Sequence, residues 1–237
     1  MKNVTVICRK ELLEISRDKK FIIPCLLMPV GMPIMLYFIT LGNMKIFQNT
    51  TMGYMFPLGL MLLGLLATMF SLGIAVESFV GEKERKTIEP LLATPLSELE
   101  LFVGKCIAAT ILPVVATYVA EVVFIGLVAL HLTRAGEKFT MAPGQILFII
   151  ILMPLLALLM CSFAVTISTR WSSVKSANQF STIIALFPLM FLFNFGPVIL
   201  PSNKIMILVV ATLVIVDALA FYIGSRVFLR EKLVSTL

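Results

Sequence analysis

Residues Gly53–Val76 read GYMFPLGLMLLGLLATMFSLGIAV, 24 residues without a single Asp, Glu, Lys or Arg. A helix needs about 20 consecutive apolar residues to cross the hydrocarbon core of a bilayer. A charged stretch, GEKERKTIEPLLATPLSELE, follows at Gly81–Glu100. The apolar run therefore predicts a membrane-spanning helix, and the charged stretch predicts a connection outside the bilayer.

The composition of the whole chain agrees with a membrane protein. The chain has 237 residues, of which 59% are hydrophobic and 14% charged, and its mean hydropathy is +1.04. A soluble domain of this size could not bury that much apolar surface. The net charge of +6 comes from bases that lie between the apolar runs, so we attribute it to membrane topology and predict no nucleic-acid partner.

The apolar runs predict an all-α integral membrane protein with six spans in a single transmembrane domain, residues 1–237. The spans are Phe21–Leu41, Gly53–Val76, Cys106–Leu130, Ile146–Ile167, Phe180–Leu200 and Ile205–Ser225. Fifteen of the nineteen Lys and Arg residues fall on one side of these spans. Because such residues are enriched in cytoplasmic loops, both termini and residues 77–105 are predicted to be cytoplasmic.

Two segments beside the spans have patterns of their own. In residues 1–20, Val4, Cys8, Leu12 and Ile15 share one helical stripe, which predicts a helix lying on the cytoplasmic membrane surface. Between the fifth and sixth spans, FNFGPVILPSNK at 193–204 contains one Gly and two Pro residues. That composition predicts a short re-entrant or broken helical segment at the outer face.

The charged connection predicts a short helix of its own, within residues 81–96. Gly81 is expected to loosen the end of the second span, Thr87 to cap the short helix, and Pro95 to end it. Ser97 and Glu100 form the capping-box pattern S-x-x-E, which predicts the start of the third span. One face of the short helix is apolar, formed by Ile88, Leu91 and Leu92. This face can lie on lipid or dock into a groove of another protein.

The stretch GEKERKTIEPLLATPLS, with LFVGK at Leu101–Lys105, resembles the corresponding loop of the ATP-binding-cassette type-2 permeases, which are membrane subunits of exporters. The opening RKELLEISRDKKFIIPCLLMPVGMPI at Arg9–Ile34 is similar to their N-terminal pattern. The resemblance implies that residues 82–92 form a coupling helix that enters a cleft of a separate cytoplasmic ATPase. The contact residues would be Glu82, Lys83, Glu84, Arg85, Ile88, Glu89, Leu91 and Leu92.

The resemblance also implies the assembly. Two copies of the permease would form a homodimer with two ATPase subunits in a prokaryotic plasma membrane, and ATP and Mg²⁺ would be bound by the ATPase. This chain is expected to be no enzyme and to need no cofactor of its own, because it lacks the phosphate-binding pattern G-x-x-x-x-G-K-[ST]. The cargo expected for such apolar spans is a hydrophobic or amphipathic peptide, lipid or drug.

Two acids interrupt the spans, Glu121 in the third and Asp217 in the sixth. An ionisable group at membrane depth is a functional candidate by default, so both are candidate substrate or cation residues. The alternative is a neutral acid hydrogen-bonded to Tyr, Ser or Thr on another helix. The two acids also keep two other functions open: sodium extrusion by an ATP-driven permease, and an ion-coupled transporter or channel without an ATPase.

No other residue pattern indicates a reaction or a metal. The four cysteines contain no C-x-x-C pair, and the single histidine, His131, has no ligand-type residues at metal-binding spacing. The sequence therefore predicts neither a disulfide framework nor a metal site. The fourteen methionines are interpreted as apolar packing residues.

Overall fold

The computed structural model describes residues 2–44, 51–85, 97–134, 136, 138–168, 171, 173–199 and 202–235. Every regular element in this part of the chain is helical. The elements are α1 (Lys2–Arg17), α2 (Lys19–Met44), α3 (Thr51–Glu84), α5 (Glu98–Arg134), α6 (Pro143–Leu147), η1 (Phe148–Leu152), α7 (Met153–Ser168), α8 (Val174–Ile199) and α9 (Asn203–Ser235).

Four stretches within these helices are long and apolar enough to cross a membrane: Phe56–Glu84, Leu99–Arg134, Pro143–Ser168 and Asn203–Arg226. They correspond to the predicted second, third, fourth and sixth spans. The predicted first and fifth spans fall on helices α2 and α8. The all-helical class is thus confirmed, and the chain is a multi-pass membrane protein. The count of six spans stays a prediction.

Three boundaries differ from the sequence-based prediction. Helix α3 does not loosen at Gly81 but continues to Glu84. Helix α5 begins at Glu98, as the capping box at Ser97 predicts, so the connection ends there rather than at Lys105. Helix α8 continues through Gly196 and Pro197 to Ile199, so it has no break in residues 193–199, and the alternative of a re-entrant segment stays a prediction. Helices α3 and α8 thus continue past glycine and proline residues that weaken a helix locally, whereas lysine favours a helix.

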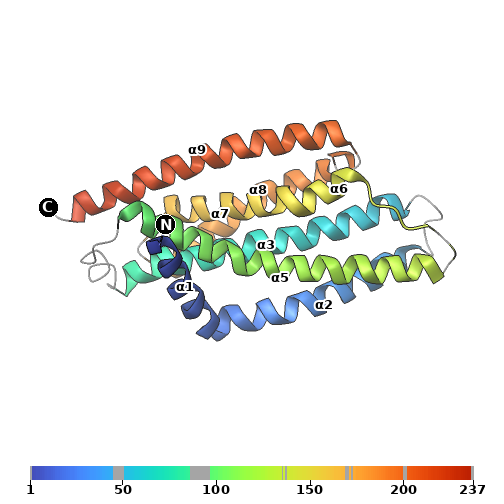
Figure 1. Ribbon diagram of the computed structural model, residues 1–237, viewed down its shortest axis with the longest axis horizontal. Coiled ribbons are helices and arrows are strands. Elements are labelled where there is room, and N and C mark those ends of the chain that lie inside the picture. Colours follow the sequence, from blue (N-terminus) through green and yellow to red (C-terminus); the bar gives the residue numbers. More distant parts are fainter. Residues whose placement is uncertain are drawn as a thin grey trace.

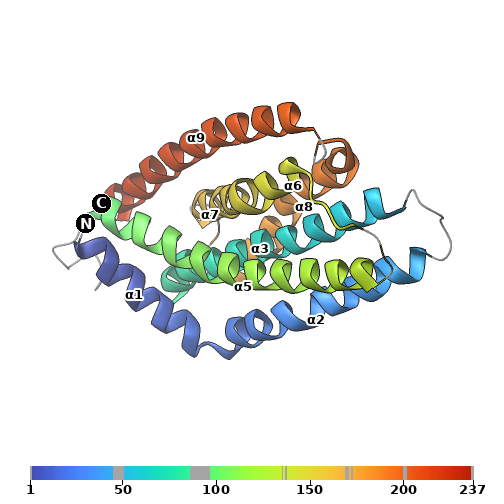
Figure 2. The same ribbon diagram turned by 45° about the vertical axis from the view of Figure 1, so that its right-hand side comes forward.

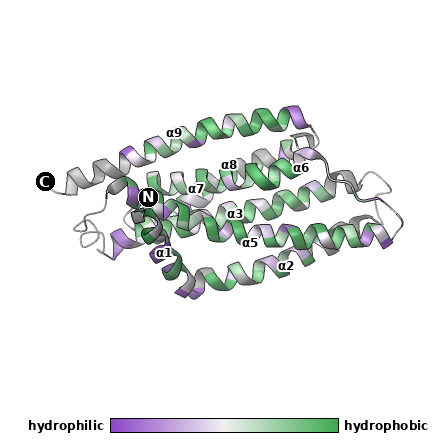
Figure 3. Ribbon diagram, viewed as in Figure 1, coloured by the Kyte–Doolittle hydropathy of each residue, from purple (hydrophilic) through white to green (hydrophobic). Residues whose placement is uncertain are grey.

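The helices form a bundle around α3. Figures 1 and 2 show α2, α3, α5, α7 and α9 running along the long axis, with α3 packed against α2, α5, α7 and α8. In its most apolar window α3 is 72% buried, whereas the corresponding window of α9 is only 6% buried. Helix α3 is therefore the central span, and α9 lies at the edge with its apolar side chains exposed. Figure 3 shows apolar residues along the spans and hydrophilic residues gathered at the two ends.

The core contains two clusters of aromatic and aliphatic side chains. One includes Phe79 and Phe102, and the other includes Phe56, Phe124 and Phe148. In the second cluster α5 approaches α3 at Gly59, where a Cβ atom would lie 2.5 Å from the Phe124 ring. The glycine allows this close approach, because a Cβ atom here would force the Phe124 ring to move.

Helix α1 lies across one end of the bundle rather than along it (Figures 1 and 2). Both chain ends, the end of α3 and the start of α5 lie at this same end of the molecule (Figure 1). The predicted stripe of α1 is shifted in the structure: its buried residues are Ile7, Glu11 and Ile15, which follow at i, i+4 and i+8. The helix thus buries a polar residue, Glu11, at the centre of its packed face.

Candidate functional site

The most strongly connected polar group in the described chain surrounds Lys105, near the start of α5. The Lys105 side chain is 1% exposed. Its ammonium Nζ lies 2.7 Å from Oε1 of Glu82 on α3 and 3.2 Å from Oε1 of Glu11 on α1. We call Glu11, Ser78, Glu82 and Lys105 the inner junction, because they join three helices at the end that carries α1.

Ser78 completes the hydrogen bonds of the inner junction. The Lys105 ammonium donates to the Ser78 carbonyl at 3.2 Å and to the Ser78 hydroxyl at 3.0 Å. The same hydroxyl donates to Oε2 of Glu11 at 2.9 Å. The Phe79 ring lies 5.6 Å from the ammonium, within cation–π range. A buried ion pair is tolerated when its remaining donors and acceptors are satisfied, and this one meets that condition.

Glu11 shows the electrostatic result of this arrangement. Burial alone would raise the pKa of its carboxyl group. The Lys105 ammonium, the Ser78 hydroxyl and Lys10 outweigh burial, so that the pKa of Glu11 lies below its usual value. Glu11 is therefore a buried carboxylate that stays ionised near neutral pH.

Close backbone packing brings α1 to the junction. At Gly104, next to Lys105, a Cβ atom would lie 2.7 Å from Cγ2 of Ile7 and 3.4 Å from the Val4 carbonyl oxygen. The absence of a side chain at Gly104 lets α1 lie directly on α5. Ile7 and Glu11 are one turn apart, so the contact at Gly104 also places Glu11 over Lys105.

The last turn of α3 also forms hydrogen bonds with the ends of two other helices. Lys83 Nζ donates to the Ser168 carbonyl at the end of α7, at 3.2 Å. The Val174 amide at the start of α8 donates to Oε2 of Glu84, at 2.8 Å. A cation at a helix C-terminus and an anion at an N-terminus both satisfy unpaired backbone groups there. The end of α3 is therefore tied to α1, α5, α7 and α8.

The predicted ATPase contacts divide into two sets. The first set belongs to the described residues and consists of Glu82, Lys83, Glu84 and Arg85. Each of these side chains forms an ion pair or a hydrogen bond within the chain. The Arg85 guanidinium lies 2.7 Å from Oε1 of Glu77. Ile88, Glu89, Leu91 and Leu92 lie outside the described residues. The capping box is confirmed: the Ser97 amide donates to Glu100 Oε2 at 3.3 Å, and the Glu100 amide donates to Ser97 Oγ at 3.2 Å.

A cavity of about 300 Å³ lies between α1 and α3 beside the inner junction. Its charged lining is mainly acidic. The acids are Glu11, Glu14, Asp18, Glu77 and Glu82, and the bases are Lys10 and Arg85. Lys10 connects the two walls, because its ammonium lies 3.3 Å from Glu14 and 3.8 Å from Glu82.

The two acids at membrane depth lie on different helices. Glu121 on α5 is 1% exposed, and Asp217 lies on the peripheral helix α9. Within the described part of the chain, none of their carboxyl oxygens has a hydrogen-bond partner. The predicted alternative, an acid bonded to Tyr, Ser or Thr, is therefore not found there. An acidic residue at mid-bilayer costs about 3 kcal/mol on insertion scales.

The helical segment that follows residue 142 contains a wide turn. Residues Phe148–Leu152 form a π-helix between α6 and α7. Pro154 explains the wide turn, because it has no amide hydrogen to donate to the carbonyl of Ile150. That carbonyl instead accepts a hydrogen bond from the Tyr118 hydroxyl on α5, at 3.3 Å.

The sequence-based reading missed the inner junction. Lys105 was counted among the bases that set topology, and neither Glu11 nor Ser78 was singled out. One signal was present: Glu11 interrupts an apolar i, i+4, i+8 stripe between Ile7 and Ile15. A charged residue on a buried stripe predicts a buried partner.

His131 contacts Tyr37, whose hydroxyl lies 3.4 Å from Nδ1.

Comparison with known proteins adds two findings. A family model described as ABC-2 family transporter protein matches residues 5–204. The chain is also similar to the ABC transporter permease protein NatB of Bacillus subtilis (strain 168), with 33% identity over 134 residues. That match covers 52% of this chain and 34% of the relative, so the chain matches about a third of the relative's length.

Proposed function

Because the chain belongs to the ABC-2 family of transporter proteins, we propose that it is the membrane-spanning permease subunit of an ATP-driven exporter. A separate cytoplasmic ATPase binds ATP and Mg²⁺ and supplies the energy. The permease forms a homodimer with two ATPase subunits. Its termini and residues 77–105 face the cytoplasm of a prokaryotic cell, as the distribution of Lys and Arg favours.

The observation that carries the proposal is the position of the inner junction. Residues 86–96 connect α3 to α5, and the Glu82–Lys105 ion pair joins the helices on either side of them. A partner that pulls on residues 86–96 would pull on α3 and α5 together. Through Glu11, Ser168 and Val174, the same pull reaches α1, α7 and α8.

In this mechanism the residues of the coupling segment have different tasks. Ile88, Leu91 and Leu92 anchor the segment in the ATPase cleft, since a few buried side chains usually dominate an interface. Glu89 and the exposed faces of Glu84 and Arg85 contribute charge at its rim. Glu82 and Lys83 transmit the movement to the helices that they bond.

The cargo proposed first is a hydrophobic or amphipathic molecule, because the spans are apolar and the described connections on the outer side are short. A small cation, sodium among them, is the second candidate. A specific observation favours it: Glu121 and Asp217 present unpaired carboxyl oxygens inside the membrane-spanning region. Residues of this type mark ion pathways in many membrane proteins.

The test is isolation of the tagged chain from its own host in mild detergent. The proposal predicts that a nucleotide-binding ATPase subunit co-purifies in equal amount and that the pair hydrolyses ATP in vesicles. Transport by the purified chain alone, driven by an ion gradient, would contradict the proposal and favour an ATPase-independent transporter or channel.

A further inference from the structure

Glu121 is an ionisable residue, and the helices packed around it have no basic residue at its depth. Between Lys105 and His131, Glu121 is the one charged residue of α5. Residues 21–44, 51–76 and 143–168, on the neighbouring helices, contain no Lys, Arg, Asp, Glu or His. Between Lys204 and Arg226 the one charged residue is Asp217, which is also an acid.

The surroundings of Glu121 give it no hydrogen-bond donor either. Its side chain is 1% exposed, and both carboxyl oxygens lack a partner among the described residues. The other titratable groups on the packed helices at this depth are tyrosines and cysteines, which are uncharged near neutral pH. A buried carboxylate in such a place must be neutralised, because an isolated charge is not stable in an apolar medium.

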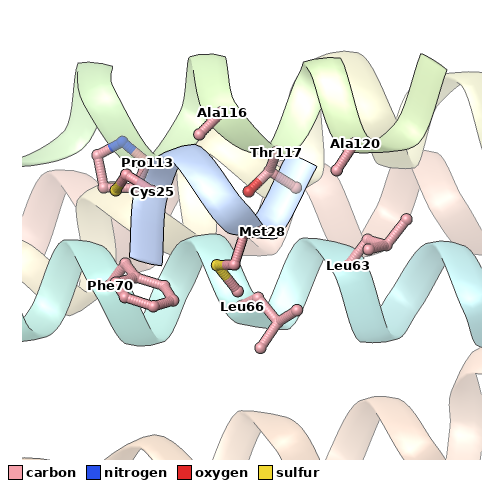
Figure 4. A pocket seen from close by; sticks show the side chains of 9 residues that line it. All are labelled: Cys25, Met28, Leu63, Leu66, Phe70, Pro113, Ala116, Thr117 and Ala120. Atoms are coloured by element: carbon pink, nitrogen blue, oxygen red, sulfur yellow. The ribbon is translucent and has the colours of Figure 1, made fainter. Parts of the chain in front are cut away.

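Oxygen atoms lie along α5 one turn before Glu121. Thr117, at i−4, lines a space of about 10 Å³ between α2, α3 and α5, and it supplies the one oxygen among the labelled side chains in Figure 4. That volume is close to that needed by one water molecule. Glu121 does not line this space itself. Tyr118, at i−3, reaches the Ile150 carbonyl in the wide turn.

We infer that Glu121 is the anionic group of a monovalent-cation site inside the helix bundle, occupied by a proton or a sodium-sized ion. One carboxylate balances one positive charge. A divalent ion would need a second acid, and no cluster of three or more His, Cys, Asp or Glu side chains lies among the described residues. The inference rests on the proposed function in one respect, that a bilayer surrounds the helix bundle. It does not depend on the ATPase or on the identity of the cargo.

The test uses the purified full-length permease in lipid nanodiscs, without ATPase, and the apolar reagent dicyclohexylcarbodiimide. A protonated carboxyl group adds its O–H across one C=N bond of the reagent. The resulting O-acylisourea rearranges to a stable N-acylurea, which mass spectrometry detects on the peptide that holds Glu121. Labelling is measured from mildly acidic to alkaline pH, in sodium chloride and in choline chloride.

We expect labelling of Glu121 to fall by roughly tenfold per pH unit once the carboxyl ionises. If sodium lowers the labelling further at a fixed pH and choline does not, the site binds sodium as well as protons. Equal labelling in both salts supports a proton site. Labelling that changes with neither pH nor salt would overturn the inference.

A second measurement guards against poor access of the reagent. The melting temperature of the wild type in choline chloride should fall as the pH rises, and that of Glu121→Gln should fall less, because glutamine carries no charge. Glu14→Gln, which removes an exposed carboxyl group on α1, is the matched control and should retain the wild-type pH response. Parallel melting curves for wild type and Glu121→Gln, together with absent labelling, would also overturn the inference. Failure of ATPase coupling would leave both measurements unchanged.

Discussion

The ammonium of Lys105 lies 2.7 Å from the carboxylate of Glu82, and these two residues stand on either side of residues 86–96 in the chain. The ion pair closes a loop between two membrane helices at the point where an ATPase is proposed to act. Lys105 is 1% exposed, so water screens this pair far less than it screens a surface pair. We therefore expect a displacement on one side of the loop to move the other side as well.

Replacing Lys105 by methionine should destabilise this end of the bundle. The variant keeps most of the side-chain volume but leaves Glu11 and Glu82 without their shared cation. Removing one partner of a buried ion pair costs about 3–5 kcal/mol. We expect a lower melting temperature in detergent and less transport per ATP hydrolysed. The control is Lys175→Met, an exposed position on α8, and equal losses in the two variants would contradict the assignment.

The pH dependence of stability should report on Glu11. Its pKa is lowered in the folded protein, so the carboxylate adds stability above its unfolded pKa of about 4.3. This stability is lost as the pH falls through the lower, folded pKa. At neutral pH the wild type should melt above Glu11→Gln, and the gap should close below about pH 4. A gap that stays constant across this acidic range would argue against the ionised junction.

Two glycines on α5 offer a matched pair of substitutions. At Gly104 an added Cβ atom would lie 2.7 Å from Ile7, whereas at Gly126 nothing lies within 4 Å. Gly104→Ala should weaken the docking of α1 at a cost of about 1–3 kcal/mol. Gly126→Ala should be neutral or stabilising by about 0.5–1 kcal/mol, because alanine favours the helix. Protease access to residues 1–17 measures the docking, and equal access in both variants would contradict the packing.

Features set by neighbouring residues were predictable from the sequence. The apolar runs predicted four helices that the structure confirms as long enough to span a membrane. The capping box at Ser97 and Glu100 was predicted because its hydrogen bonds link residues three positions apart. Both features depend on the local chain alone, so one sequence is sufficient to find them.

The inner junction was not predictable in the same way. It joins Glu11, Ser78, Glu82 and Lys105 from three helices, and each pairing depends on how those helices rotate and pack. In the sequence, Lys105 looks like any base at the end of a span. Its burial follows from α1, which covers it through the close contact at Gly104.

The proposed orientation predicts which connections are reached from outside the cell. The test starts from a variant without the four native cysteines. Arg85→Cys then places a single thiol at an exposed position before α5, and Lys138→Cys places one at an exposed position after α5. A membrane-impermeant maleimide added to whole cells should label position 138 and leave position 85 unlabelled until the cells are opened. Labelling of position 85 in intact cells would reverse the orientation.

The central claim, that residues 86–96 couple the bundle to an ATPase, is tested most directly by replacing Leu91 and Leu92 together with serine. Pull-down of the ATPase and transport-linked ATP hydrolysis are measured on the same reconstituted vesicles. Leu99→Ser, at an exposed leucine near the start of α5, is the control. We predict that the double variant inserts normally but loses most ATPase binding or coupling, because a few buried anchors dominate such contacts. Wild-type binding together with wild-type coupling in the double variant would contradict the account.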